Sequence, residues 1–279
     1  MLWPRAATTA AGLRTGTRSL ATGSRLHVHS ACARFQVQPQ SVPEAAGFTA
    51  REIPAVLRKL TEGEYIRFTI PADLHAPPQA RTGSFVETPI RNCSLDFSTG
   101  VFTKTRAVSV GTRFSHASKQ HRNFRWLPYS PGGITTVATG GMDVLSGKFS
   151  GCWMIAYQVQ GRPEPHVAHV GTVDTSEETN DKVKVTWNNF AGGAAIRLLA
   201  GFKPSETFRL NPPVPSGKDS IWVMLGGISC HPEPLLYSIG LYGQRDDSNH
   251  YRIAAIRPIQ SVPLPDIQHL LLTTDVRRA

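Results

Sequence analysis

The feature that most constrains the fold of this chain is a series of short runs in which apolar and polar residues alternate. In the segment Tyr65 to Ile70, for example, Ile66, Phe68 and Ile70 occupy every second position, which is the period of a half-buried strand. Glycine and proline separate these runs, as expected where strands end in turns. The pattern therefore favours a chain built mainly from strands.

Further runs of this kind follow along the chain. We expect strands at Phe85–Thr88, Cys93–Phe97, Val101–Val110, Trp153–Val159, Val167–Val170, Val183–Trp187, Ile221–Leu225, Tyr237–Tyr242 and Tyr251–Ile256. Helical patterns are few: one helix is expected from the capping-box residues Thr49 and Glu52 through Leu60, with Gly63 ending it. We therefore predict an α+β fold, in which a β-sandwich or a mixed sheet forms the core and a few helices flank it.

The first 43 residues differ in composition from the rest of the chain. They are rich in Arg, Ala, Thr, Ser and Gly, and no acidic residue precedes Glu44. Such a segment cannot bury enough apolar surface to fold alone. We predict a disordered basic leader at residues 1–43, either a secretion or targeting segment or a plain tail, and a single domain at residues 44–279.

The chain is basic, with 30 Lys and Arg residues against 20 Asp and Glu residues. This balance is compatible with an acidic protein, an anionic membrane or a nucleic acid as partner. The basic residues are scattered, however, and no nucleic-acid-binding signature accompanies them, so we expect no nucleic-acid partner. No apolar run approaches the roughly 18 residues of a membrane span, so no integral membrane segment is expected.

Four cysteines, Cys32, Cys93, Cys152 and Cys230, lie far apart and form no CxxC pair. Neither a zinc site nor a dense disulfide framework is indicated, and at least one thiol can be free.

A local cluster of His27, His29 and Cys32 in the leader lacks a fourth ligand. We therefore expect no metal and no cofactor.

Candidate chemistry is concentrated between Arg125 and Thr172. Cys152 lies where a glycine-rich loop becomes an apolar strand, and Ser150 and Gly151 precede it. Small residues at such a junction let a substrate carbonyl approach backbone N–H groups that can bind an oxyanion. A thiol with a pKa of roughly 8.5 needs a nearby imidazole to become an effective nucleophile near neutral pH.

Two histidines, His166 and His169, lie on the following strand. Their odd separation places them on opposite faces of a sheet, so only one of them can meet the thiol. We choose His169, which lies deeper in the strand and is followed by the small pair Gly171 and Thr172. The choice over His166 rests mostly on the resemblance described below.

The spacing of the two strands limits this pairing. A tight turn centred between Arg162 and Pro163 would place His169 opposite Ala156, about 13 Å along the strand from Cys152 at roughly 3.3 Å per residue. A Cys–His dyad then requires another register, a bulge or non-adjacent strands. From residue types alone, Cys152 is also compatible with an ordinary buried cysteine.

Several features in one order resemble a known family. They are Trp126–Tyr129, Ile134–Val137, Ser150-Gly151-Cys152 and His169. In these residues the chain resembles the cysteine-dependent glutamine deamidase toxins, including the Burkholderia lethal factor and the catalytic domain of cytotoxic necrotizing factor. Their catalytic core is similar to that of the chemoreceptor glutamine deamidases. The resemblance extends over about Glu44 to Thr172, less than half of the chain.

The resemblance implies that the domain at residues 44–279 is catalytic. Cys152 would attack the side-chain carboxamide of a target glutamine, and His169 would protonate the departing ammonia. Ser146 stands where some members of the family have a threonine hydroxyl that orients the site. The implied fold is a β-sandwich with outer helices, and no cofactor is implied.

The implied partner is a host protein with an exposed glutamine, for which Rho-type GTPases and a translation-initiation helicase are precedents in the family. The protein would then be secreted or injected and would act in the host cytosol. Two alternatives stay open. The same dyad could serve a transglutaminase or a thiol protease, or the chain could be a non-enzymatic, basic, β-rich binding module.

Overall fold

The computed structural model describes residues 55–75, 81–98, 121–209, 220–230, 233–244 and 247–270. All of them belong to one compact unit, Thr49–Ala279. The leader at residues 1–43, the strand expected at Val101–Val110 and the cluster of His27, His29 and Cys32 lie outside the described residues.

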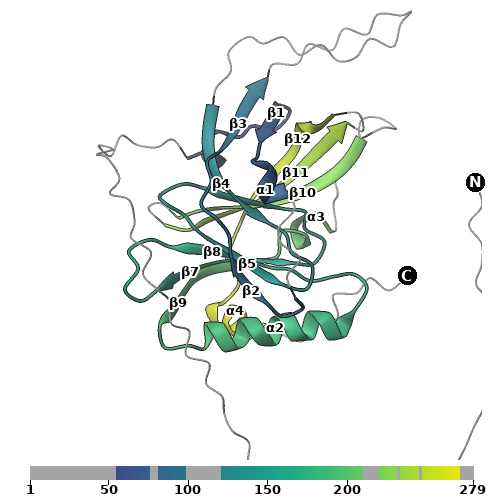
Figure 1. The fold of residues 1–279 in the computed structure, drawn as a ribbon. Coiled ribbons are helices and arrows are strands. Elements are labelled where there is room, and N and C mark those ends of the chain that lie inside the picture. Colours follow the sequence, from purple (N-terminus) through teal and green to yellow (C-terminus); the bar gives the residue numbers. More distant parts are fainter. Residues whose placement is uncertain are drawn as a thin grey trace, which may run out of the picture. The chain divides into compact units, whose positions relative to one another are not determined.

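Most of the described chain forms two sheets (Figure 1). The first is a closed barrel of seven strands, β1-β12-β11-β10-β6-β4-β3. Its strands are β1 (Tyr65–Thr69), β3 (Cys93–Ser98), β4 (His121–Pro128), β6 (Val144–Gly147), β10 (Ser220–Ser229), β11 (Leu235–Gln244) and β12 (Asp247–Ile259). All neighbours in the barrel are antiparallel except β4 and β6, which are parallel.

The second sheet has five strands in the order β2-β5-β8-β7-β9. They are β2 (Phe85–Glu87), β5 (Ile134–Ala138), β7 (Trp153–Val159), β8 (His166–Val170) and β9 (Ile196–Phe202). Only the β2–β5 pair is parallel. The short helical segments are η1 (Leu57–Lys59), α1 (Ala72–His75), α3 (Glu206–Arg209) and α4 (Leu264–Gln268), and the one long helix is α2 (Glu177–Ala191).

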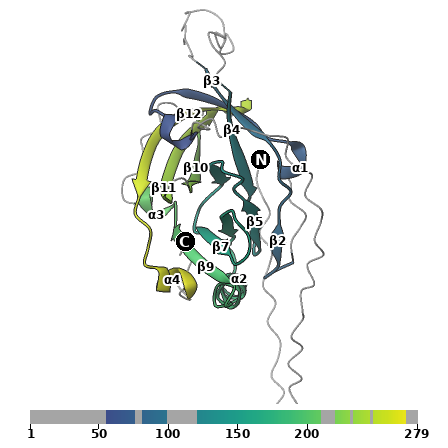
Figure 2. The same cartoon turned by 90° about the vertical axis from the view of Figure 1, so that its left-hand side faces the viewer.

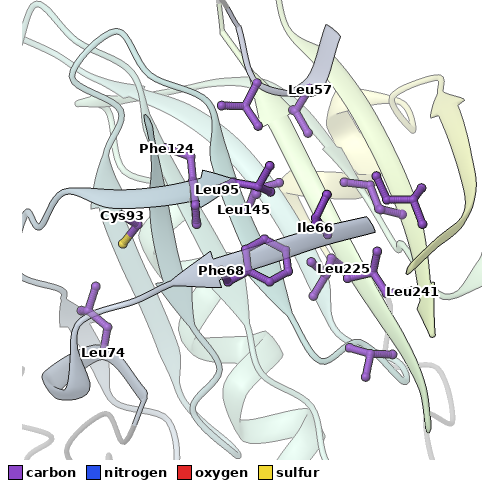
Figure 3. Close-up of a cluster of buried hydrophobic side chains, with 14 residues drawn as sticks. Leu57, Ile66, Phe68, Leu74, Cys93, Leu95, Phe124, Leu145, Leu225 and Leu241 are labelled. Carbon is purple, nitrogen blue, oxygen red and sulfur yellow. The ribbon is translucent and has the colours of Figure 1, made fainter. Parts of the chain in front are cut away.

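The five-stranded sheet is buried on both faces. On one face Met154 and Val167 pack against Leu127 and Ile228 of the barrel. The other face is covered by α2, as Figures 1 and 2 show, so that barrel, sheet and helix form three successive layers. A further apolar cluster lies within the barrel itself (Figure 3).

The predicted α+β class with a β-rich core is confirmed, and both sheets are mixed. Expected strands are present at Phe85–Thr88, Cys93–Phe97, Trp153–Val159, Val167–Val170, Ile221–Leu225, Tyr237–Tyr242 and Tyr251–Ile256, most of them longer than expected. Four strands were not expected: β4, β5 and β6, in and just before the glycine-rich region, and β9. The first three are short or rich in polar residues, and β9 (IRLLAGF) does not alternate regularly, so the alternation is weak in all four.

The strand expected at Val183–Trp187 is wrong, because these residues lie in α2. Val183 and Trp187, four residues apart, are both buried against the sheet, whereas Val185 is 46% exposed. Ser176 caps the helix by accepting a hydrogen bond from Thr179 N, a start signal that outweighs the local alternation.

The helix expected between Thr49 and Leu60 is also wrong in its described part. There the chain forms only the short 3-10 turn η1, and it is extended again at Leu60. The main-chain nitrogen of Leu57 donates to the buried Asp143 carboxylate at 2.8 Å, so a side chain from the distant β5–β6 connection fixes this turn.

Candidate active site

The register of β7 and β8 differs from the one expected from a tight turn. Met154 faces His169, and Trp153 faces Val170. The expected pairing of His169 with Ala156 is therefore wrong by two residues. The midpoint of the connection between the two strands lies between Gly161 and Arg162, one residue before the expected position. A shift of two residues leaves His169 on the same face of the sheet and brings it closer to Cys152.

Cys152 and His169 lie on the same face of the five-stranded sheet. Continued by one residue, the register places Cys152 opposite Gly171, which makes Cys152 and His169 diagonal neighbours across the two strands; the Cα atoms of such a pair are roughly 7–8 Å apart. Cys152 and Met154 both belong to the layer between sheet and barrel, and His169 is the cross-strand partner of Met154. The two residues that the sequence indicated therefore lie on one face of the sheet, two residues apart in register.

His166 lies on the opposite face, as its odd separation from His169 predicts. It packs against Tyr157 with ring centroids 5.5 Å apart, and its Nε2 lies 3.1 Å from Arg162 Nη1. Burial, and then the neighbouring Arg162 charge, lower the pKa of His166. His166 therefore does not share a face of the sheet with Cys152.

The hydroxyl of Ser146, on the barrel strand β6, contacts His169. Ser146 Oγ donates to the main-chain oxygen of Leu127 at 2.7 Å and lies 2.7 Å from His169 Nδ1. Because a carbonyl oxygen can only accept, the single hydroxyl proton points to Leu127. Ser146 Oγ must then accept a hydrogen bond from Nδ1–H, which fixes the neutral tautomer with the proton on Nδ1 and a free lone pair on Nε2.

The imidazole of His169 is enclosed by aromatic rings. Phe149 stacks on it with centroids 4.4 Å apart and planes 11° apart, and Tyr129 lies at 5.3 Å. His169 is 1% exposed, and Nε2 is buried without a hydrogen-bond partner among the described residues. Burial lowers the pKa of this imidazole to about 3, so the ring is neutral at neutral pH.

The thiol of Cys152 is held at the carbonyl of Thr172. Cys152 Sγ donates to Thr172 O at 3.6 Å, and the Thr172 hydroxyl donates to Cys152 Sγ at 3.7 Å. Tyr129 Oη donates to the same carbonyl at 2.9 Å. The sulfur and the phenol hydroxyl therefore gather around one main-chain oxygen, and the pKa of Tyr129 is raised by burial and by the neighbouring Cys152 and Asp174.

The segment that carries Thr172 is fixed from both sides. Gly171 exchanges main-chain hydrogen bonds with Gly132 and Gly133, each at 2.8 Å, and a Cβ at Gly171 would lie 2.1 Å from Ser130 O. Only glycine allows this close approach. On the other side, Asn180 of α2 clamps Val173, accepting from its nitrogen at 2.7 Å and donating to its oxygen at 2.9 Å.

In the described part of the chain, Cys93, Cys152 and Cys230 form no disulfide. Burial raises the pKa of Cys93, and burial followed by the charge of Asp143 raises that of Cys230 to about 12. Neither environment favours a thiolate. Cys152 is buried as well, with 1% of its surface exposed, and what distinguishes it from the other two is that it shares a sheet face with the imidazole of His169.

Sequence reasoning missed three parts of this arrangement: Tyr129, Phe149 and the carbonyl of Thr172. Tyr129 could have been found from the sequence, because it belongs to the Trp126–Tyr129 motif of the resemblance. No sequence pattern pointed to Phe149, because its role comes from packing against His169 on strand β8. Within the described residues no cluster of His, Cys, Asp and Glu could hold a metal ion, and no helix there is long and apolar enough to cross a membrane.

No protein-family profile matches the chain, and no curated protein matches it. Among solved structures, the chain is similar to the C-terminal domain of CNFy from Yersinia pseudotuberculosis. The two chains are 7% identical and the TM-score is 0.22. The match covers 48% of this chain and 61% of the CNFy domain, so it spans less than two thirds of that domain.

Proposed function

We propose that the protein is a cysteine-dependent amide hydrolase that deamidates a glutamine side chain of another protein. The observation that carries the proposal is the arrangement of three side chains. Cys152 and His169 are diagonal neighbours on one sheet face, and Ser146 holds His169 by Nδ1 at 2.7 Å. A nucleophile, a base and a group that orients the base are the parts that thiol catalysis needs.

In the first half of the reaction the thiol proton passes to Nε2 of His169, and the sulfur attacks the carboxamide carbon of the glutamine. Backbone N–H groups beside Cys152 would hold the resulting oxyanion. The imidazolium then returns its proton to the departing nitrogen, ammonia leaves, and a thioester joins Cys152 to the substrate.

In the second half, His169 takes a proton from water, and the oxygen of that water attacks the thioester carbon. The thiol regains its proton from the imidazolium, and the glutamine has become glutamate. The neutral imidazole with a free Nε2 is the form that each half-reaction requires at its start. Because Phe149 and Tyr129 enclose the imidazole, we expect one of these rings to move aside when substrate binds.

The proposal is tested by adding the purified protein to a host-cell lysate and comparing it with Cys152→Ser. Deamidation adds about one dalton to a target glutamine, whereas an amine adduct or a cut chain changes the mass far more. We expect glutamines with this small mass increase in the lysate treated with the wild type, and none in the lysate treated with Cys152→Ser. Adducts or cleavage would instead favour a transglutaminase or a protease, and equal activity of the variant would exclude Cys152 as the nucleophile.

A further inference from the structure

A cavity of about 680 Å³ reaches from the barrel to the connection between β6 and β7. Its walls come from β1, α1, β4, β6, β10, β11 and β12, and they include Phe68, Trp126, Leu225 and Leu241. Figure 3 shows Phe68, Leu225 and Leu241 on separate strands that surround the barrel interior. These side chains are apolar and partly or fully buried, so the cavity offers an apolar lining to whatever occupies it.

The polar residues of the lining mark where the cavity meets solvent. Lys148, Ser150 and Asp174 line it, and all three are exposed. The Ser150 hydroxyl donates to the Asp174 carboxylate at 3.3 Å across this opening. The cavity therefore has an apolar interior and one polar rim, the pattern that orients a molecule with an apolar part and a polar part.

The cavity adjoins the Cys152–His169 site. Tyr129 and Phe149, the two rings that enclose His169, also belong to the cavity lining. Ser150, on the rim, lies two residues before Cys152. The apolar cavity and the imidazole are thus separated by a single layer of side chains.

We propose that the barrel cavity is a substrate-anchoring subsite that takes a bulky aromatic or branched aliphatic side chain of the substrate, close in sequence to the glutamine that reaches Cys152. The inference rests on the proposed function, because it assumes a polypeptide substrate. A carboxamide gives little apolar contact, so an anchor away from the reacting group supplies binding energy that holds the glutamine in place. The volume has room for such a side chain together with adjoining chain atoms.

The test uses short glutamine peptides in which the flanking positions carry either Leu and Phe or Ala. Burying one such side chain corresponds to about a 10- to 100-fold higher kcat/KM. We expect the wild type to prefer the apolar peptides by that factor. We expect Val223→Phe, which fills part of the cavity, to bring the ratio of kcat/KM between the apolar and the Ala peptides down to about one.

The matched control is Val185→Phe, the same substitution at a 46% exposed position of α2, on the other side of the sheet from the barrel. It should keep the preference, and thermal unfolding of both variants checks that they fold. A wild type without preference, or a Val223→Phe variant that slows all peptides equally, would overturn the subsite while leaving the deamidase proposal standing.

Binding of the same peptides, followed by the fluorescence of Trp126 in the cavity wall, separates the two proposals. If the wild type deamidates neither the peptides nor any protein of the lysate but binds the apolar peptides more tightly, and Val223→Phe removes that difference, the subsite stands and the proposed function fails. If neither turnover nor binding distinguishes the peptides, the subsite is wrong. Comparison with Trp126→Phe assigns the signal to this residue.

Discussion

The hydroxyl of Ser146 decides which nitrogen of His169 can act as a base. It donates to Leu127 O and therefore accepts from Nδ1, so that the lone pair remains on Nε2. The position of Ser146 six residues before Cys152 could be taken from the resemblance. The contact of its hydroxyl with His169 could not be predicted. It depends on the pairing of β6 with β4 in the barrel, and both strands are distant from His169 in the chain.

Replacing Ser146 by alanine removes both hydrogen bonds from a fully buried position. We expect Ser146→Ala to lower kcat about three- to tenfold, since one neutral hydrogen bond contributes about 0.5–1.5 kcal/mol. Ser146→Thr keeps the hydroxyl and should retain most of the activity. Steady-state rates on a verified substrate measure both, and an unchanged rate for Ser146→Ala would show that the hydroxyl does not orient the base.

Burial of His169 also makes the fold sensitive to acid. Its pKa is about 3 in the folded protein and about 6.5 in an unfolded chain. Between these values only the unfolded chain binds the proton, so folding stability falls as the pH falls from about 6.5 towards 3. At pH 5 this loss amounts to about 2 kcal/mol relative to pH 7.

The comparison with His169→Asn isolates this contribution, because asparagine keeps a donor for Ser146 and does not titrate. Urea unfolding at pH 7 and pH 5 should show a smaller loss of stability in the variant by about that amount. Other buried groups, including His166, contribute equally to both proteins. Equal losses in the two proteins would mean that the buried imidazole is not neutral in the fold.

At the level of elements, the β7–β8 pair determines whether thiol and imidazole meet. The two strands and the opposite faces of His166 and His169 could be predicted from alternation, which is a local property. The register could not, because the connection at residues 158–165 is longer than a tight turn and is held by its own contacts, such as that of Gln158 Nε2 with Glu164 O at 3.3 Å. The strand expected at Val183–Trp187 is wrong because a five-residue run is too short to distinguish strand from helix. Its first and fifth residues, Val183 and Trp187, also lie on one face of a helix.

Helix α2 positions the site through one side chain. Asn180 holds Val173, next to the carbonyl that binds the Cys152 thiol. Asn188, two turns along the same helix, holds Leu270 with a similar pair of bonds, accepting from its nitrogen at 2.7 Å and donating to its oxygen at 3.5 Å. The two asparagines therefore offer a matched comparison between a clamp near the site and one away from it.

We expect Asn180→Ala and Asn188→Ala each to lower the free energy of unfolding by about 1–3 kcal/mol, the cost of leaving main-chain groups unpaired. Only Asn180→Ala should also lower kcat/KM, because it frees the segment that carries Thr172. Denaturant unfolding and turnover, measured on the same preparations, separate the two effects. A parallel loss of activity in both variants would mean that general stability, and not the position of Thr172, limits the rate.

At the scale of the whole molecule, the candidate site lies between two sheets rather than within one. The barrel supplies Ser146, and the five-stranded sheet supplies His169 and the strand that follows Cys152. The barrel closes through pairs such as Tyr65 with Arg252, which lie far apart in the chain. Alternation indicates strands but not such partners, so the α+β class could be predicted from the sequence, whereas the closed barrel and its cavity could not.

The most direct test of the Cys152–His169 site is the intact mass of the protein, quenched during turnover of a substrate peptide that it deamidates. A thioester at Cys152 adds the mass of the peptide less one ammonia. We predict this adduct, located at Cys152 by peptide mapping, in the wild type and its absence in Cys152→Ser. Conversion of glutamine to glutamate that proceeds in Cys152→Ser at the wild-type rate would contradict the assignment of the nucleophile.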